Sequence, residues 1–464
     1  MKNLTCRIVV LSMMGACVAH AEPPLALHPN NPHYFLFRGY PPVLITSREH
    51  YGTVLNLNFD YVKYLDALAA DGLNLAKVQP IKRQVGKPAP QFLASEIGNS
   101  ESPYAAWAHG PSRDPSFFPI AVWLQSPRNV AAFKEAGINV YVGLWRGPTA
   151  EQLDKLGAAG MKVICAQNAL ALERRDDTTI IGWMHGDEPD NAQPKSGGGY
   201  GPPNAPETIV EGYRKIRAAD PSRPVLLNLG QGVAWDEWHG RGVRSRHPED
   251  YPEYIQGSDI ASFDIYPVVH DKPQVTGNLW YVARGVERLR MWSKGEKIVW
   301  NCIEAARISN PNVKPTAAQI KTEVWMSLIH GSTGILYFVH QFKPDYVEAS
   351  LLRDAELLRG VTEINRQIHS LAPVLNSPTI RDGAVVTSSN PDASVAALVK
   401  RHGAATYVFA VAMRDTAVKA SFTIRDGPRE GAAEILSESR SIPVRDGRFE
   451  DEFKPYAVHL YRIE

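Results

Sequence analysis

Residues 118–167 read FPIAVWLQSPRNVAAFKEAGINVYVGLWRGPTAEQLDKLGAAGMKVICAQ. Three short apolar runs, at 120–125, 139–145 and 162–167, alternate here with two amphipathic stretches. Each amphipathic stretch ends near a glycine, where a helix commonly stops. Near-continuous apolar strands that alternate with helices are typical of a parallel sheet covered by helices.

The same alternation continues to about residue 375. Five further apolar runs follow, at 180–188, 224–229, 260–266, 298–304 and 334–340. Eight strand–helix units predict a fold of the α/β class, a (β/α)8 TIM barrel over residues 114–375, whose last helix covers roughly 345–375.

The pattern changes on both sides of this region. Residues 376–464 contain short alternating runs broken by Gly, Asp, Pro and Asn, which predict a C-terminal all-β sandwich domain. Residues 22–113 hold a strand–helix–strand pattern followed by an irregular linker. This N-terminal segment is either a cap that packs on the barrel or the remnant of a related barrel.

The chain opens with features of an export signal. Lys2 and Arg7 flank an apolar run, and Ala19-His20-Ala21 forms an A-x-A cleavage site, so residues 1–21 are expected to be a signal peptide. We expect a secreted or periplasmic protein with no membrane contact after cleavage, because no later stretch is apolar for the ~20 residues that a membrane span requires. A lipoprotein anchored at Cys17 is the less favoured alternative.

Charge and cysteine content narrow the choice of partners. The chain of 464 residues carries 50 Lys and Arg against 49 Asp and Glu, for a net charge of +1 and no basic run. This balance argues against nucleic acid as a partner and favours an uncharged or small one. After cleavage only Cys165 and Cys302 remain, each inside an apolar run, and buried free thiols are expected rather than a disulfide.

Two glutamates end strands where a barrel places its active site. Glu188 closes the fourth apolar run and Glu304 closes the seventh, and glutamate is a poor strand residue. Cleavage of a glycosidic bond uses one protonated carboxyl group and one ionised carboxylate, and strands four and seven face each other across a barrel mouth. The alternative for either residue is a loop carboxylate in solvent.

The predicted barrel with these two glutamates resembles the clan A retaining glycoside hydrolases. The resemblance implies that Glu188 is the acid/base, that Glu304 is the nucleophile, and that Tyr266 hydrogen-bonds the nucleophile. The clan usually has Asn before the acid/base to hold the sugar 2-hydroxyl, whereas this chain has Asp187, whose charge would raise the pKa of Glu188. The expected function is a secreted bacterial glycosidase that acts on a neutral oligo- or polysaccharide by a retaining double displacement.

Other strand ends supply amide, indole and imidazole groups suited to a neutral sugar. Besides Asp187 and Tyr266, the candidate substrate-binding residues are Gln125, Trp145, Gln167, Asn168, Asn228 and His340.

Two other functions remain open at this stage. A metal-dependent hydrolase could use the run His185-x-Asp187-Glu188-x-Asp190 together with Asp264, His270 and Asp271. The first apolar run lacks the His pair usual in metal barrels, so no metal and no cofactor is expected. The third possibility is a carbohydrate-binding barrel without catalytic activity.

Overall fold

The computed structural model describes residues 102–464 and four short strands before them, and it divides into two units, 1–84 and 85–464. In the first unit, β1 (Leu25–Leu27) pairs antiparallel with β2 (Phe35–Phe37), and β3 (Thr46–Ser47) pairs parallel with β4 (Leu75–Ala76). β3 and β4 fall where the sequence predicts two strands. The expected signal peptide and the helix between these strands lie outside the described residues.

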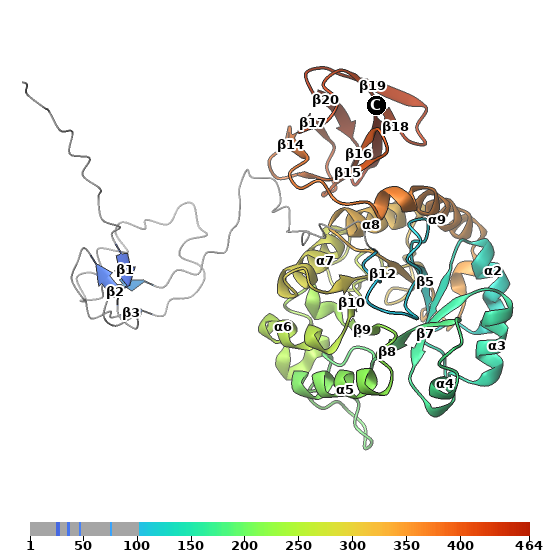
Figure 1. The fold of residues 1–464 in the computed structure, drawn as a ribbon. Helices are drawn as coiled ribbons and strands as arrows, with labels where there is room; N and C mark the ends of the chain where they lie inside the picture. The colour runs from blue at the N-terminus through green and yellow to red at the C-terminus, as the bar shows by residue number, and fades with distance from the viewer. Residues whose placement is uncertain (1–24, 28–34, 38–45, 48–74, 77–101) are drawn as a thin grey trace, which may run out of the picture. The chain divides into compact units, whose positions relative to one another are not determined.

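The second unit contains a closed parallel barrel (Figure 1). Every strand lies inside one of the eight predicted runs. The seventh run is split at Trp300 into two strands, of which β11 pairs with β10 and β12 pairs with β13, so that this run closes the ring. The strands are β5 (Ile120–Trp123), β6 (Val140–Val142), β7 (Lys162–Ala166), β8 (Ile180–Met184), β9 (Val225–Leu229), β10 (Ile260–Phe263), β11 (Ile298–Val299), β12 (Asn301–Glu304) and β13 (Ile335–Phe338).

Helices surround the barrel on its outer side (Figure 1). Two of them, α3 and α8, begin with capping boxes, formed by Thr149 with Gln152 and by Thr316 with Gln319. The helices are α2 (Val130–Glu135), α3 (Ala150–Ala158), α4 (Ala169–Glu173), α5 (Pro206–Ala219), α6 (Tyr251–Tyr254), α7 (Trp280–Trp292), α8 (Ala317–Ile329) and α9 (Ala355–Leu375).

The last barrel helix begins later than the sequence pattern predicts. It starts at Ala355 rather than near residue 345, because the side chain of Asp354 accepts a hydrogen bond of 3.1 Å from the N–H of Leu357 and caps the helix there. Residues 341–354 consequently form a loop after β13, with one short 3-10 turn.

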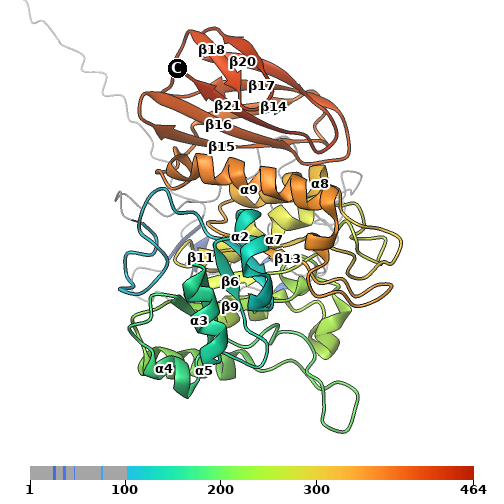
Figure 2. The same cartoon turned by 90° about the vertical axis from the view of Figure 1, so that its right-hand side faces the viewer.

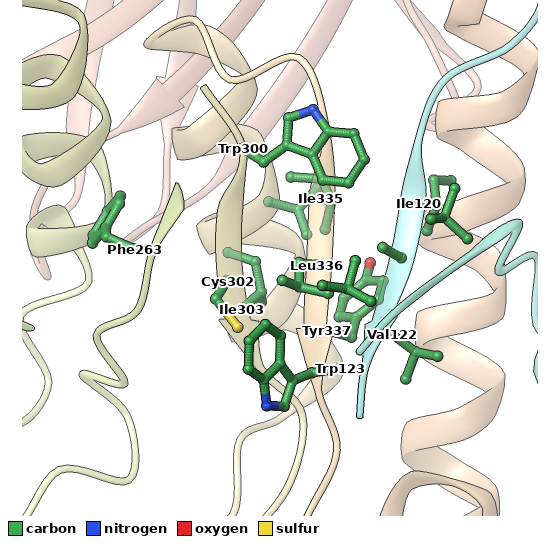
Figure 3. Packing of buried hydrophobic residues seen from close by; sticks show 14 of the residues in the cluster. Ile120, Val122, Trp123, Phe263, Trp300, Cys302, Ile303, Ile335, Leu336 and Tyr337 are labelled. Atoms are coloured by element: carbon green, nitrogen blue, oxygen red, sulfur yellow. The ribbon is translucent and has the colours of Figure 1, made fainter. Parts of the chain in front are cut away.

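Large side chains fill the barrel interior. Figure 3 shows Trp123, Trp300 and Cys302 gathered between β5, β12 and β13. Tyr104 closes the N-terminal end, since its hydroxyl accepts from Trp300 Nε1 at 2.9 Å and donates to the carbonyl of Thr333 at 3.3 Å. Part of the expected linker therefore belongs to the barrel unit. Cys165 and Cys302 are buried free thiols, as expected.

The C-terminal residues form the predicted second, all-β domain, with two antiparallel sheets ordered β14-β17-β20 and β15-β16-β21-β18-β19. The domain stands over α8 and α9 (Figure 2), and the Thr322 hydroxyl of α8 donates to the Tyr456 carbonyl at 2.8 Å. Within the described residues, no helix combines the length and the apolar character needed to cross a membrane. The strands are β14 (Ala384–Ser388), β15 (Val395–His402), β16 (Ala405–Ala412), β17 (Val418–Ile424), β18 (Gly431–Ile435), β19 (Arg440–Val444), β20 (Arg448–Phe453) and β21 (Val458–Ile463).

Candidate active site

Three carboxyl groups meet at the C-terminal ends of neighbouring strands. Asp187 and Glu188 follow β8, and Asp264 follows β10. The carboxyl groups of Glu188 and Asp264 are hydrogen-bonded to each other. On β9, which lies between these strands, Asn228 Nδ2 donates to Asp187 Oδ1 at 3.0 Å. Strands that are adjacent in the sheet therefore bring all three carboxyl groups, here called the carboxyl cluster, together.

The turn that carries Glu188 has an unusual backbone. Glu188 has φ of +41°, in the left-handed region, while its N–H donates to the Asn228 carbonyl at 3.0 Å. Asp190 anchors the turn from below, because it is fully buried and accepts from the Gly230 N–H at 2.9 Å and from the Tyr251 hydroxyl at 2.7 Å. A non-glycine residue held in this conformation is a frequent feature of functional sites.

The surroundings of the pair favour a proton on Glu188 and a negative charge on Asp264. Burial raises the pKa of Glu188 well above its usual range, and the charges of Asp264 and Asp187 raise it further. Burial raises the pKa of Asp264 to about 7, while hydrogen bonds from Glu188 and from the Tyr266 hydroxyl, at 3.0 Å, act in the opposite direction. Of the two groups, Asp264 therefore ionises first and Glu188 keeps its proton to higher pH.

Asp187 is the most accessible member of the cluster. Its side chain is exposed, whereas Glu188 and Asp264 are half-buried. Protein atoms nevertheless surround Asp187 closely, and burial raises its pKa to about 6, partly offset by the hydrogen bond from Asn228. Solvent therefore reaches Asp187 most readily, whereas Asp264 Oδ1 is shielded from solvent.

Glu304 does not join this cluster, in contrast to the predicted pairing with Glu188 across the barrel mouth. Its side chain is 0% exposed, and its two carboxyl oxygens accept from the N–H groups of Val268 at 2.6 Å and Val269 at 2.9 Å. The same carboxyl group is hydrogen-bonded to Glu323 of α8. The amide groups after β10 thus hold Glu304 inside the barrel wall.

The surroundings of Glu304 and Glu323 favour a proton shared between the two carboxyl groups. Burial raises the pKa of Glu304 to about 7 and that of Glu323 well above its usual range. Within the described part of the chain, neither oxygen of Glu323 has an N–H or O–H donor from another group. Two carboxylates cannot remain ionised in contact without such donors, so one of them must stay protonated.

Tyr266 and Asn228, both predicted substrate-binding residues, lie at the carboxyl cluster. Tyr266 donates to Asp264 rather than to Glu304, and its oxygen lies 3.5 Å from Cys302 Sγ. Asn228 is oriented by Ser262, whose hydroxyl donates to Asn228 Oδ1 at 2.7 Å. Asp264 was predicted only as a possible metal ligand and not as the partner of Glu188, although it follows a strand in the same way as Glu188.

No contact with the carboxyl cluster is seen among the described residues for the other predicted sugar-binding residues. Asn168 caps α4 by accepting from the Ala171 N–H at 2.9 Å, and Gln167 donates to the Ile216 carbonyl at 3.1 Å. Trp145 is 67% exposed in the loop after β6. His340, which is 4% exposed, lies 3.1 Å from the amide nitrogen of Gln125.

The histidines of the alternative metal site make hydrogen bonds to other protein groups. His185 Nδ1 accepts from the Gly186 N–H at 2.7 Å, and its Nε2 faces the Ile209 carbonyl at 3.0 Å. His270 Nε2 lies 2.7 Å from the Gln231 side-chain oxygen. Among the residues that the structure describes, no group of three or more His, Cys, Asp or Glu side chains is arranged to hold a metal ion.

Comparison with known proteins gives likenesses only at the level of solved structures. No protein-family model and no curated protein matches the sequence. Similar structures include an Anoxybacillus alpha-amylase (10% identity, TM-score 0.46, 76% of this chain and 99% of that chain). Another is an alpha-amylase from Geobacillus thermoleovorans complexed with acarbose (10% identity, TM-score 0.45, 76% of this chain and 99% of that chain). A third is a GH30 endoxylanase from Clostridium papyrosolvens (11% identity, TM-score 0.41, 75% of this chain and 96% of that chain). Likenesses at this level do not place the chain in a family or assign it a reaction.

Proposed function

We propose that the protein is a glycoside hydrolase that cleaves a neutral oligo- or polysaccharide by a retaining double displacement. The observation that carries this proposal is the contact between the carboxyl groups of Glu188 and Asp264 at the C-terminal end of the barrel, where the surroundings raise the pKa of Glu188 further than that of Asp264. Two carboxyl groups whose surroundings push their pKa values apart are suited to be the acid and the nucleophile of such a reaction.

In the first step, Glu188 donates its proton to the glycosidic oxygen while Asp264 attacks the anomeric carbon. The leaving sugar departs as an alcohol, and an ester joins Asp264 to the remaining sugar. In the second step, the Glu188 carboxylate takes a proton from water, and the water oxygen displaces Asp264 from the anomeric carbon. Both carboxyl groups then return to their starting protonation states.

The contact between Glu188 and Asp264 favours a retaining over an inverting mechanism, because retaining pairs stand closer together, about 5–5.5 Å against about 6.5–9.5 Å. The side chains would separate when a sugar enters between them. We assign to Asp264 the nucleophile role that the family resemblance gave to Glu304, because Asp264 contacts Glu188, whereas Glu304 is held by the N–H groups of Val268 and Val269.

Asp187 and Trp145 are proposed as substrate contacts. Asp187 is exposed and held by Asn228, so its carboxylate can accept a hydrogen bond from a sugar hydroxyl beside the acid. The exposed indole of Trp145 offers a face for a sugar ring. The leader at residues 1–21 supports export, and the near-zero net charge suits a neutral substrate.

The test is a release assay on plant and algal polysaccharides and aryl glycosides, with the anomer of the first product read by NMR. Glu188→Gln should lower kcat/KM for polysaccharide by roughly 10²–10⁴-fold, the range expected for loss of an acid–base group, and Asp264→Asn, which removes the nucleophile, should lower it at least as much. Glu363→Gln, an exposed residue of α9, serves as the control. Wild-type rates in both site variants, or an inverted product, would contradict the proposal.

A further inference from the structure

An aromatic loop follows β13, at the end of the barrel that also carries the carboxyl cluster. Its outer part holds two large exposed rings, Phe342 at 47% and Tyr346 at 62%. Neighbouring exposed aromatic side chains form the kind of apolar patch that can mark a binding surface. Neither ring takes part in the proposed chemistry.

The loop is held firmly at its base. The backbones of Gln341 and Val347 exchange two hydrogen bonds of 2.9 Å, which close residues 341–347 into a small hairpin, here called the aromatic hairpin. Phe342 N–H also donates to the Arg307 carbonyl at 3.0 Å. Glu348, the residue after the hairpin, connects it to the segment after β5. Its carboxylate accepts a hydrogen bond from the Ser126 N–H at 2.7 Å and forms an ion pair with Arg128. A binding surface held in this way loses little conformational entropy when it is occupied.

The rings form one layer. Phe342 and Tyr346 have centroids 5.9 Å apart with planes 29° apart. The buried ring of His340 lies 6.3 Å from Phe342 and 6.1 Å from Tyr346, with planes at 10° and 25°. The rings of Phe342 and Tyr346 are therefore nearly parallel to each other, and both lie near the buried ring of His340.

The layer is continuous with the carboxyl cluster. Tyr266, which donates to Asp264, has its ring 5.3 Å from Phe338. Phe338 in turn lies 5.9 Å from Phe342. A path of ring contacts therefore runs from the proposed nucleophile to the exposed edge of the aromatic hairpin.

We propose that Phe342 and Tyr346 form a subsite that binds a sugar residue of the substrate away from the bond that is cleaved. This inference rests on the proposed function and names the substrate class as an oligo- or polysaccharide that extends over several sugar residues. Apolar rings bordered by amide and carboxyl groups, such as those of Gln341 and Glu348, suit a ring that has both C–H faces and hydroxyl groups. Continuity with the cluster favours a sugar chain over a protein partner.

Binding is measured first, in the Glu188→Gln background so that the polysaccharide is not degraded. The probes are soluble starch, xylan, galactomannan and laminarin, each cast into a native gel. At least one should retard the protein, and Tyr346→Ala or Phe342→Ala should weaken that retardation by roughly tenfold, as expected for the loss of one stacked ring. Met291→Ala, which removes an exposed apolar side chain from α7, should leave the retardation unchanged.

Kinetics then separate this subsite from the proposed chemistry. In the otherwise wild-type enzyme, Tyr346→Ala should lower the ratio of kcat/KM for the polysaccharide to kcat/KM for an aryl monoglycoside by roughly tenfold, through KM. The inference is overturned if no probe retards the protein, or if Tyr346→Ala and Met291→Ala behave alike. A Glu188→Gln enzyme that binds polysaccharide normally yet still hydrolyses it would instead overturn the proposed function.

Discussion

The Glu304–Glu323 pair predicts an unusual dependence of stability on pH. A carboxyl group whose pKa is higher in the folded state than in the unfolded state binds its proton more tightly when folded. Stability from such a group is therefore present at low pH and is lost as pH rises from the unfolded to the folded pKa. For Glu304 this window runs from 4.5 to about 7.

The size of the effect follows from the same shift. One pKa unit corresponds to about 1.4 kcal/mol, so Glu304 alone should lower the free energy of unfolding by roughly 2–3 kcal/mol between pH 5 and pH 8. Glu323→Gln replaces the shared proton with an amide N–H, which can donate to Glu304 at any pH. Glu304 keeps its two backbone donors in this variant, while Glu323, whose pKa is raised well above its usual range in the folded protein, no longer contributes to the pH dependence.

The assay is urea unfolding followed by tryptophan fluorescence at pH 5 and pH 8. We expect Glu323→Gln to lose roughly 2 kcal/mol less than the wild type between these two pH values. Other buried carboxyl groups contribute equally to the pH dependence of both proteins. The difference in lost unfolding free energy therefore reports on the Glu304–Glu323 pair. The exposed substitution Glu363→Gln should behave like the wild type. Equal losses in Glu323→Gln and the wild type would show that the two glutamates do not share a proton.

Three further predictions concern the carboxyl cluster and can be measured with an aryl glycoside. Asp187→Asn removes a charge that raises the pKa of Glu188, so the basic limb of the kcat/KM profile should move to lower pH; an unmoved limb would exclude Glu188 as the acid. Tyr266→Phe removes a hydrogen bond that lowers the pKa of Asp264, so the acidic limb should move to higher pH, and a shift to lower pH would contradict this assignment. Activity should survive exhaustive chelation with EDTA, whereas a loss that a divalent ion restores would favour a metal-dependent hydrolase.

The sequence was sufficient to predict the barrel because its strands are short apolar runs with few competing interpretations. Each of the eight runs contains barrel strand, and the seventh is interrupted only at Trp300. The start of the last helix was misplaced because residues 345–354 are compatible with a helical pattern. Asp354, a good N-cap residue, was the signal that could have corrected it.

The site was only partly predictable. Glu188 could be found because a carboxylate at a strand end in a barrel points to the active-site face. The same rule failed for Glu304, because its position depends on two amide N–H groups in another loop and on a glutamate buried in α8. Contacts of this kind join residues distant in sequence and leave no local pattern. The predicted last helix begins near residue 345 and so overlaps only the second half of the aromatic hairpin, which has no sequence pattern of its own.

The most direct test of the central claim is to identify the residue that forms the covalent intermediate. The enzyme is incubated with 2-deoxy-2-fluoro glycosides of glucose, galactose, mannose and xylose that carry a good leaving group, and the labelled peptide is sequenced by mass spectrometry. Slow turnover of these reagents should allow a glycosyl ester to accumulate on the nucleophile. The carboxyl cluster predicts the label on Asp264, and a label on Glu304, or no label with any reagent, would contradict it.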